Sequence, residues 1–362
     1  MKGRVLVIDG PARGAALISD GRLQDLIFDA PEGQAVPGPG EIYRAKVDRL
    51  VPGMGGAFVR LTDAHQGFLR ETKGLKQGGE ILVQVSSHAE PGKAVPVSRR
   101  PLLKSRRVIL TPGAPGINAS RGIKDTELRR RLSAEVTLDA QDIGLILRTA
   151  ARGAEPAHLS AEAAHLLAVW REIEAGGAGR LWHMDAATTA LCEWTDPLPD
   201  AIHCFGFPRQ VIEKYTEIMP LVADMEPAPF EAFGVWEAVE RLRAPESALP
   251  SGGMMAVEAT RAMVTVDVNT GPGFSAGAAM TTNIEAAREL PRQLRLRGLG
   301  GQITVDFAPL KKMHRKKIEE VLRSAFRTDP VETSLAGWTP LGHFELQRKR
   351  ERRPLTEILN EI

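Results

Sequence analysis

Two short stretches decide the fold class of the C-terminal part of the chain: MVTVDVNTG, from Met263 to Gly271, and GQITVDFAPL, from Gly301 to Leu310. Both alternate apolar and polar residues with a period of two, which is typical of a strand with one buried face. Asp267 shares the polar face of the first strand with Asn269, and Asp306 has the matching place in the second. The repeated carboxylate raises the question of what it holds.

The segment between the two stretches has the pattern of an amphipathic helix. Its apolar stripe comprises Ile284, Ala287, Leu290 and Leu294. Thr282 or Asn283 is expected to cap the start of this helix, and the glycines from 298 to 301 to end it. A strand, a helix and a strand form a crossover unit, so the two strands are expected to be parallel neighbours.

This arrangement would bring Asp267 and Asp306 together at the carboxyl ends of adjacent strands, where open α/β sheets bind ligands. Two adjacent carboxylates repel each other, so a proton or a cation has to lie between them. Hard oxygen ligands, with Asn269 beside them, favour magnesium or manganese over zinc. The alternative is that both aspartates are strand-end caps or turn residues.

An earlier region, residues 38–98, carries several short alternating strands with glycines between them. This pattern predicts a small closed barrel such as an OB-fold. Phe58 and Phe68 lie in its middle strands. Either both rings belong to the barrel core, or one or both stack on bases of a nucleic acid.

The composition is ordinary for a globular protein of two or three domains, with 362 residues, 43% hydrophobic and 25% charged. The sequence contains no run of 18 apolar residues, so no membrane span is expected. The two cysteines, Cys192 and Cys204, form no C-x-x-C pair. A reducing cytoplasm is therefore the expected location. The basic clusters KKMHRKK (311–317) and RKRERR (348–353) are either solvated faces or polyanion-binding surfaces.

At this point three stretches resemble the catalytic region of the ribonuclease E/G family: LPSGGMMAVEATRAMVTVDVNTG, TNIEAARELPRQLRLRGLGGQITVDF and FELQRKR. GEIYRAKVDRLVPGMGGAFVRLTDAHQGFL resembles the RNA-binding barrel of that family, and GLILRTAA resembles its 5′-sensor region. The resemblance runs through nearly the whole chain in the family's order.

The resemblance implies an α/β multidomain fold, in which an RNase H-like region is interrupted by an OB-type β-barrel and a sensor domain and is followed by a DNase I-like α/β catalytic domain. The implied domains are 1–37 (RNase H-like region, first part), 38–98 (barrel), 99–178 (5′ sensor), 179–242 (RNase H-like region, second part) and 243–362 (catalytic domain with a basic tail). The implied activity is magnesium-dependent cleavage of single-stranded RNA, such as precursors of ribosomal RNA or messenger RNA.

The resemblance also implies roles for single residues of the catalytic region and the sensor. Asp267 and Asp306 match the metal-binding aspartates, and Asn269 matches the asparagine that orders the site. Arg148 and Thr149 match the pair that binds the 5′-monophosphate of the RNA.

In the barrel, the resemblance implies that Phe58 and Phe68 contact bases and that Lys93 is a basic RNA contact. These three positions complete the set of implied site residues.

The chain departs from the family pattern at four places. GPGFSAGAAM follows the asparagine motif in place of acidic residues, and DFAP stands where many members have DFID. Pro340, in WTPLGHFEL, stands near the place where ribonuclease E-type members have a sensor arginine before FGLLEM. The C-x-x-C zinc link is absent, so neither zinc nor a zinc-linked dimer is expected.

Two classes of function follow. The first is an endoribonuclease that uses magnesium, with manganese as the alternative ion. The second is a non-catalytic RNA-binding relative, which the lost acidic residues suggest. The retained set of Asp267, Asn269 and Asp306 favours the enzyme, because a protein that only binds RNA has little use for two repelling carboxylates. A general DNA nuclease or phosphoesterase is a distant third reading.

Overall fold

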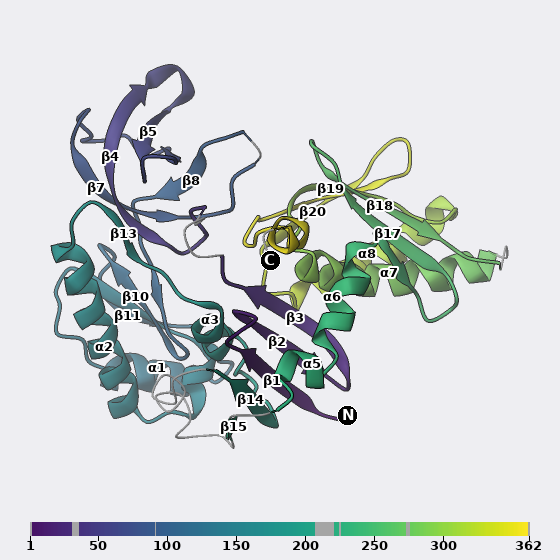
Figure 1. The fold of residues 1–362 in the computed structure, drawn as a ribbon, viewed down its shortest axis with the longest axis horizontal. Coiled ribbons are helices and arrows are strands. Elements are labelled where there is room, and N and C mark those ends of the chain that lie inside the picture. The colour runs from purple at the N-terminus through teal and green to yellow at the C-terminus, as the bar shows by residue number, and fades with distance from the viewer. Residues whose placement is uncertain are drawn as a thin grey trace. The chain divides into compact units, whose positions relative to one another are not determined.

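The computed structural model describes residues 2–30, 36–90, 92–206, 221–223, 226–272 and 276–360. They form a mixed α/β protein with several sheets (Figure 1). Their contacts divide the chain into two compact units, Met1–Gly21 with Ile27–Pro229, and Arg22–Leu26 with Phe230–Ile362. Among the described helices, none has both the length and the apolar composition that crossing a membrane requires. The five domain boundaries and their family assignments stay predictions.

The N-terminal part of the chain contains three groups of paired strands. Its elements are β1 (Arg4–Asp9), β2 (Gly14–Ser19), β3 (Arg22–Phe28), β4 (Ile42–Val51), η1 (Pro52–Met54), β5 (Gly56–Arg60), β6 (Gln66–Leu69), β7 (Glu80–Val85), β8 (Val95–Ser98), β9 (Leu103–Lys104), β10 (Val108–Pro112), β11 (Gly116–Ala119), α1 (Thr126–Glu135), β12 (Ile143–Leu147), η2 (Thr149–Gly153), α2 (Pro156–Ala175), β13 (Gly179–Trp182), α3 (Ala186–Glu193), β14 (Ala201–Phe205) and β15 (Leu221–Ala223). One sheet has the order β15-β14-β1-β2-β3, and a second has the order β11-β12-β10-β9.

The barrel expected from the strand pattern is confirmed. Its strands follow the order β4-β5-β6-β8-β7, and β7 pairs back with β4, which closes the ring. Tyr43, Val59, Leu69 and Val83 point inward and are buried. Alternation along each strand therefore sends the intervening side chains to the outer surface of the barrel.

The C-terminal part is built on one six-stranded sheet. Its elements are α5 (Pro229–Ala232), α6 (Val235–Arg243), β16 (Glu246–Ala248), β17 (Met254–Ala259), β18 (Val264–Asn269), α7 (Ala276–Leu296), β19 (Gly301–Asp306), η3 (Lys312–His314), α8 (Arg315–Arg327), β20 (Thr333–Trp338), β21 (Phe344–Arg348) and α9 (Leu355–Leu359). The strand order is β16-β17-β18-β19-β21-β20. The predicted crossover is confirmed, because β18 and β19 are parallel neighbours joined through α7.

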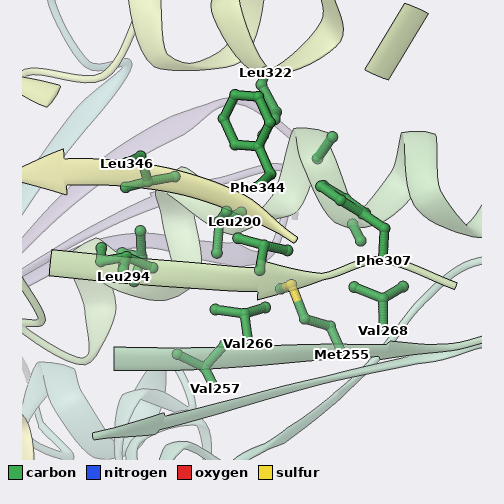
Figure 2. Packing of buried hydrophobic residues seen from close by; sticks show 14 of the residues in the cluster. Met255, Val257, Val266, Val268, Leu290, Leu294, Phe307, Leu322, Phe344 and Leu346 are labelled. Atoms are coloured by element: carbon green, nitrogen blue, oxygen red, sulfur yellow. The ribbon is translucent and has the colours of Figure 1, made fainter. Parts of the chain in front are cut away.

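The hydrophobic core of this unit lies between the sheet and the helices α7 and α8. Val266 and Val268 from β18 meet Leu290 and Leu294 from α7, with Leu322 from α8 in the same cluster (Figure 2). This arrangement buries one face of the sheet. The alternate residues, among them both aspartates, therefore lie on the opposite and exposed face.

The expected cap of the helix between the strands is wrong. α7 begins at Ala276, so Thr282 and Asn283 lie inside it and are buried. The Asn283 amide donates a hydrogen bond to Ala308 O at 2.8 Å and accepts one from Ala308 N at 2.9 Å. Local sequence suggested a cap because asparagine favours helix starts. Its tertiary partner holds it in the interior of the helix.

Two arginines of the basic cluster 348–353, Arg348 and Arg352, differ from both readings of the sequence, whereas Lys349 in the same cluster is exposed. Arg348 is 1% exposed and pairs with the Asp329 carboxylate at 2.9 Å. Arg352 pairs with both oxygens of Asp25, and Arg295 contacts Asp25 and Asp329 together. These arginines form a buried ionic network within the second unit, so they are neither a solvated face nor an open polyanion surface.

Candidate active site and RNA-binding surfaces

The two aspartates are direct neighbours across the β18–β19 ladder. The parallel register pairs Asp267 with Asp306, and adjacent strands lie about 4.8 Å apart. Both residues are exposed, and 64% of the Asp306 side chain is accessible. The adjacency that the sequence predicted is therefore present, on the sheet face that no helix of this core covers.

Two asparagines order this end of the sheet. Asn269 donates from its amide to Asp267 Oδ2 at 2.5 Å, which orients that carboxylate. Asn283 holds the backbone of Ala308, two residues beyond Asp306, through both of its amide atoms. The strand end that carries Asp306 is thus tied to the helix behind it. GPGFSAGAAM, the departure after Asn269, falls partly outside the described residues, at 273–275.

A residue that sequence reasoning missed lies beside Asp306. His343 Nε2 is 3.9 Å from Asp306 Oδ1. The turn before β21 places this histidine, because Thr339 N donates to His343 O and His343 N donates to Thr339 Oγ1. The available signal was a histidine in GHFEL, where the family pattern FGLLEM has leucine.

The donor set fits a hard divalent ion. In the ranges that the structure describes, no three His, Cys, Asp or Glu side chains gather into a ligand group. The protein would therefore supply the two carboxylates, and water would supply the remaining ligands. Magnesium and manganese accept this arrangement, whereas zinc usually requires three or four protein ligands in a tetrahedron.

The first basic cluster begins five residues after Asp306. Lys311, Lys312 and Lys316 are exposed, and His314 and Arg315 are half-buried. The Arg315 guanidinium lies over the Trp338 ring, 4.9 Å from its centroid. Positive charge therefore follows directly in the chain after the acidic pair.

Phe58 and Phe68 lie outside the buried cluster of the barrel, so the reading of both rings as core side chains is wrong. They pair directly across β5 and β6, with an edge-to-face contact at a centroid distance of 5.4 Å. Both rings are half-buried, and the Arg49 guanidinium lies 5.2 Å from the Phe58 centroid. Lys93 is on a neighbouring loop, 67% exposed and paired with Glu90 at 2.5 Å. An aromatic pair with an arginine beside it is a surface suited to unpaired nucleic acid.

Replacing either ring by alanine is expected to weaken binding of single-stranded RNA by about 1–3 kcal/mol, which is the usual cost of losing one stacked base. The change should lower the melting temperature far less than Leu69→Ala, which removes a buried core side chain. Fluorescence anisotropy with an unstructured RNA, beside thermal melts, separates the two effects. Unchanged affinity in both folded variants would rule out stacking.

Arg148 and Thr149, the two residues predicted to bind a 5′-phosphate, differ in their contacts. Arg148 donates from Nη1 to Ser105 O at 2.7 Å, and its Nη2 pairs with Glu193 Oε2 at 2.5 Å. Thr149 begins η2, with its hydroxyl close to the backbone of Gly122. The arginine therefore already has an anionic partner within the chain.

Cys192 in α3 and Cys204 in β14 are both buried. We expect purified protein to carry no stoichiometric zinc, because a zinc site shared between two chains needs two closely placed thiolates from each. Metal analysis checks this expectation, together with the mass in solution with and without a chelator. A zinc-dependent dimer would contradict it.

A cavity of about 650 Å³ is lined by residues of α7, α8 and the start of β3, among them Arg22, Arg288, Arg292 and Lys317. The helices separate it from the sheet, and the acidic pair is on the sheet's other face. It therefore has no part in the candidate active site.

Comparison with known proteins shows the family of this chain. The model of the Ribonuclease E/G family matches residues 102–192 and 201–351, which is more than half of the chain. The chain is 29% identical to Ribonuclease G of Escherichia coli over 389 residues, covering 95% of this chain and 79% of that protein. It is 29% identical to Ribonuclease G of Haemophilus influenzae over 398 residues, covering 95% and 78%. It is 28% identical to Ribonuclease E of Nostoc sp. over 393 residues, covering 96% of this chain and 56% of that protein.

The chain belongs to the ribonuclease E/G family. Asp267, Asn269, Asp306, Arg148 and Thr149 lie inside the matched residues, and the barrel residues lie before them.

Proposed function

We propose that this protein is a magnesium-dependent endoribonuclease that cleaves single-stranded RNA in RNA processing or decay. The observation that carries the proposal is the in-register pair of exposed carboxylates, Asp267 and Asp306. Membership of the ribonuclease E/G family supports it. Two carboxylates on adjacent strands repel each other unless a proton or a cation lies between them, and an exposed pair of hard oxygen ligands suits a cation.

The chain's own residues have distinct tasks in this proposal. Asp267 and Asp306 would hold the divalent ion, which supplies an activated water and neutralises charge that develops on the phosphate. The Asn269 amide fixes Asp267 through its Oδ2 and leaves Oδ1 for other partners. His343, 3.9 Å from Asp306, stands where it can donate to a phosphate oxygen beside that carboxylate.

Each unit by itself offers groups that suit RNA. The outer surface of the barrel offers the Phe58 and Phe68 rings with Arg49, and Lys311 and Lys312 follow Asp306 in the chain. Stacking and phosphate contacts of this kind are tolerant of sequence. Unpaired RNA suits them, because a duplex hides the faces of its bases.

The second candidate function is RNA binding without cleavage, favoured by the loss of acidic residues after Asn269. One experiment separates the two. Purified protein is incubated with a labelled A/U-rich single-stranded RNA, with magnesium, with manganese and with a chelator. Cleavage that requires the ion supports the enzyme, whereas a stable complex without products supports the binding protein.

We also propose that Arg148 and Thr149 contact the 5′-phosphate of the RNA and that the resulting stimulation is weak. Ribonuclease E-type relatives have a further arginine donor near the position of Pro340, which has no donor at all. Losing one charge-assisted hydrogen bond costs about 1.5–3 kcal/mol.

We therefore expect 5′-monophosphate RNA to be cleaved no more than about tenfold faster than 5′-hydroxyl or 5′-triphosphate RNA. Initial rates on one RNA with the three ends test this. A preference of about a hundredfold or more, abolished by Arg148→Ala, would show an intact sensor and refute the expectation.

A further inference from the structure

A single carboxylate bridges two cations at the end of α3. Glu193 Oε2 lies 2.5 Å from Arg148 Nη2, and Glu193 Oε1 lies 3.5 Å from Lys104 Nζ. Each oxygen of the carboxylate thus faces a different positive group. A phosphate monoester offers the same feature, namely several oxygens that share negative charge, and guanidinium groups bind both anions in the same manner.

The rest of Arg148 is fixed by the backbone around it. Its Nη1 donates to Ser105 O at 2.7 Å and approaches Cys192 O at 3.5 Å. The guanidinium cannot swing away from Glu193 without breaking these bonds. An anion that binds at Nη2, on the side of Arg148 that Glu193 contacts, therefore competes with this carboxylate.

Solvent reaches this cluster. The exposed fraction is 28% for the Glu193 side chain and 49% for Lys104. Next to Arg148 in the chain, the Thr149 hydroxyl lies against Gly122, where an added Cβ would come within 2.5 Å of Thr149 Oγ1. The glycine therefore leaves the hydroxyl room that a larger residue would remove.

We propose that Glu193 is a built-in competitor for the anion site formed by Arg148 and Lys104. It occupies the site in the free protein, so a 5′-terminal phosphate has to displace it, and RNA is bound with little regard to the state of its 5′ end. The inference rests on the proposed function, in which Arg148 and Thr149 meet that phosphate. It adds the residue that sets how strongly the end is sensed.

The test is Glu193→Gln, which keeps the shape of the side chain and removes its charge. Two short RNAs of one sequence, one with a 5′-monophosphate and one with a 5′-hydroxyl, are prepared. The affinity of the full chain for each is measured in the presence of a chelator, so that no cleavage occurs. The preference is the dissociation constant for the 5′-hydroxyl RNA divided by the dissociation constant for the 5′-monophosphate RNA. We expect Glu193→Gln to raise this ratio at least tenfold by tightening the complex with the phosphorylated RNA alone.

Two controls make the result specific. Glu127→Gln removes an exposed carboxylate of the same unit, paired with Arg130 at 3.0 Å, and should leave the ratio unchanged. Glu193→Gln combined with Arg148→Ala should lose the gain. Thermal melts confirm that each variant is folded, and Glu193→Asp, which keeps the charge, replaces the glutamine variant if that one unfolds. Its shorter side chain bridges the two cations less well, so the ratio should rise, by less than tenfold.

An unchanged or lower ratio in Glu193→Gln, or a gain that survives Arg148→Ala, would overturn the inference. With Glu193→Asp as the replacement, a ratio that stays at the wild-type value would overturn it as well. The readout is independent of cleavage. If Glu193→Gln raises the ratio while neither the wild type nor this variant cleaves RNA in the presence of magnesium, the inference stands and the proposed enzymatic function fails.

Discussion

Asp306→Asn is expected to abolish RNA cleavage while leaving RNA affinity within a few fold. Asp306 is in register with Asp267 on the neighbouring parallel strand, and its side chain is 64% exposed. The substitution keeps the size of the side chain but removes the charge that would hold the divalent ion. Losing one preorganised electrostatic group typically lowers the rate by about 10²–10³-fold, and a lost ion would lower it further.

Initial cleavage rates and RNA affinity measure the two effects, and manganese binding followed by electron paramagnetic resonance reports the ion directly. Asp267→Asn should behave in the same way. The matched control is Glu258→Gln on the same exposed sheet face, opposite Thr265 rather than beside the pair. Its activity should match the wild type. Full activity in either aspartate variant would refute the assignment of the metal site.

The second large effect concerns stability. Asp329→Ala is expected to destabilise the C-terminal unit by about 3–5 kcal/mol, which is the usual cost of leaving a buried charge without its partner. Asp329 and Arg348 are each 1% exposed in their side chains and lie 2.9 Å apart, and Arg295 also pairs with Asp329. Burial lowers the pKa of the Arg348 guanidinium below its usual value, and Asp329 opposes this shift. Without Asp329, the guanidinium keeps the cost of burial and loses the compensation.

Thermal melts should show a decrease of roughly 6–20 °C in the transition of this unit. The matched control is Glu319→Ala, whose ion pair with Arg323 on α8 is exposed and should contribute under about 0.5 kcal/mol. The double variant Asp329→Leu with Arg348→Met should recover most of the loss, because apolar replacements of similar size remove both charges. An Asp329→Ala melt equal to that of the control would show that the network contributes nothing.

Much of the fold could be predicted from apolar residues that recur with a period of two in strands and of 3.6 in helices. The alternation in the two opening stretches placed the aspartates on one face, and the helical stripe between them required a crossover, so parallel neighbours followed. The short strands and glycines after Glu41 were sufficient to predict the closed barrel. These features are local, since a few adjacent residues and the rule of strand alternation determine them.

Functional detail depended on contacts between residues far apart in the chain. The sequence left open whether Phe58 and Phe68 are core or surface residues. The closed barrel has the adjacent Val59 and Leu69 in its core, so the two phenylalanines lie on its outer side. His343 reaches Asp306 only because β21 lies beside β19.

By itself, the sequence determined the strand–helix–strand unit and the barrel, because the order of apolar and polar residues along each segment sets its strand or helix period. Only the tertiary structure decided the partners of charged and amide side chains. Asn283 forms hydrogen bonds with the Ala308 backbone instead of capping the helix. Arg348 is buried in an ion pair with Asp329, and Arg148 forms an ion pair with Glu193. Such side chains are satisfied by whatever polar group the fold brings near, because a buried charge or amide without a partner is costly. No local pattern specifies which group that will be.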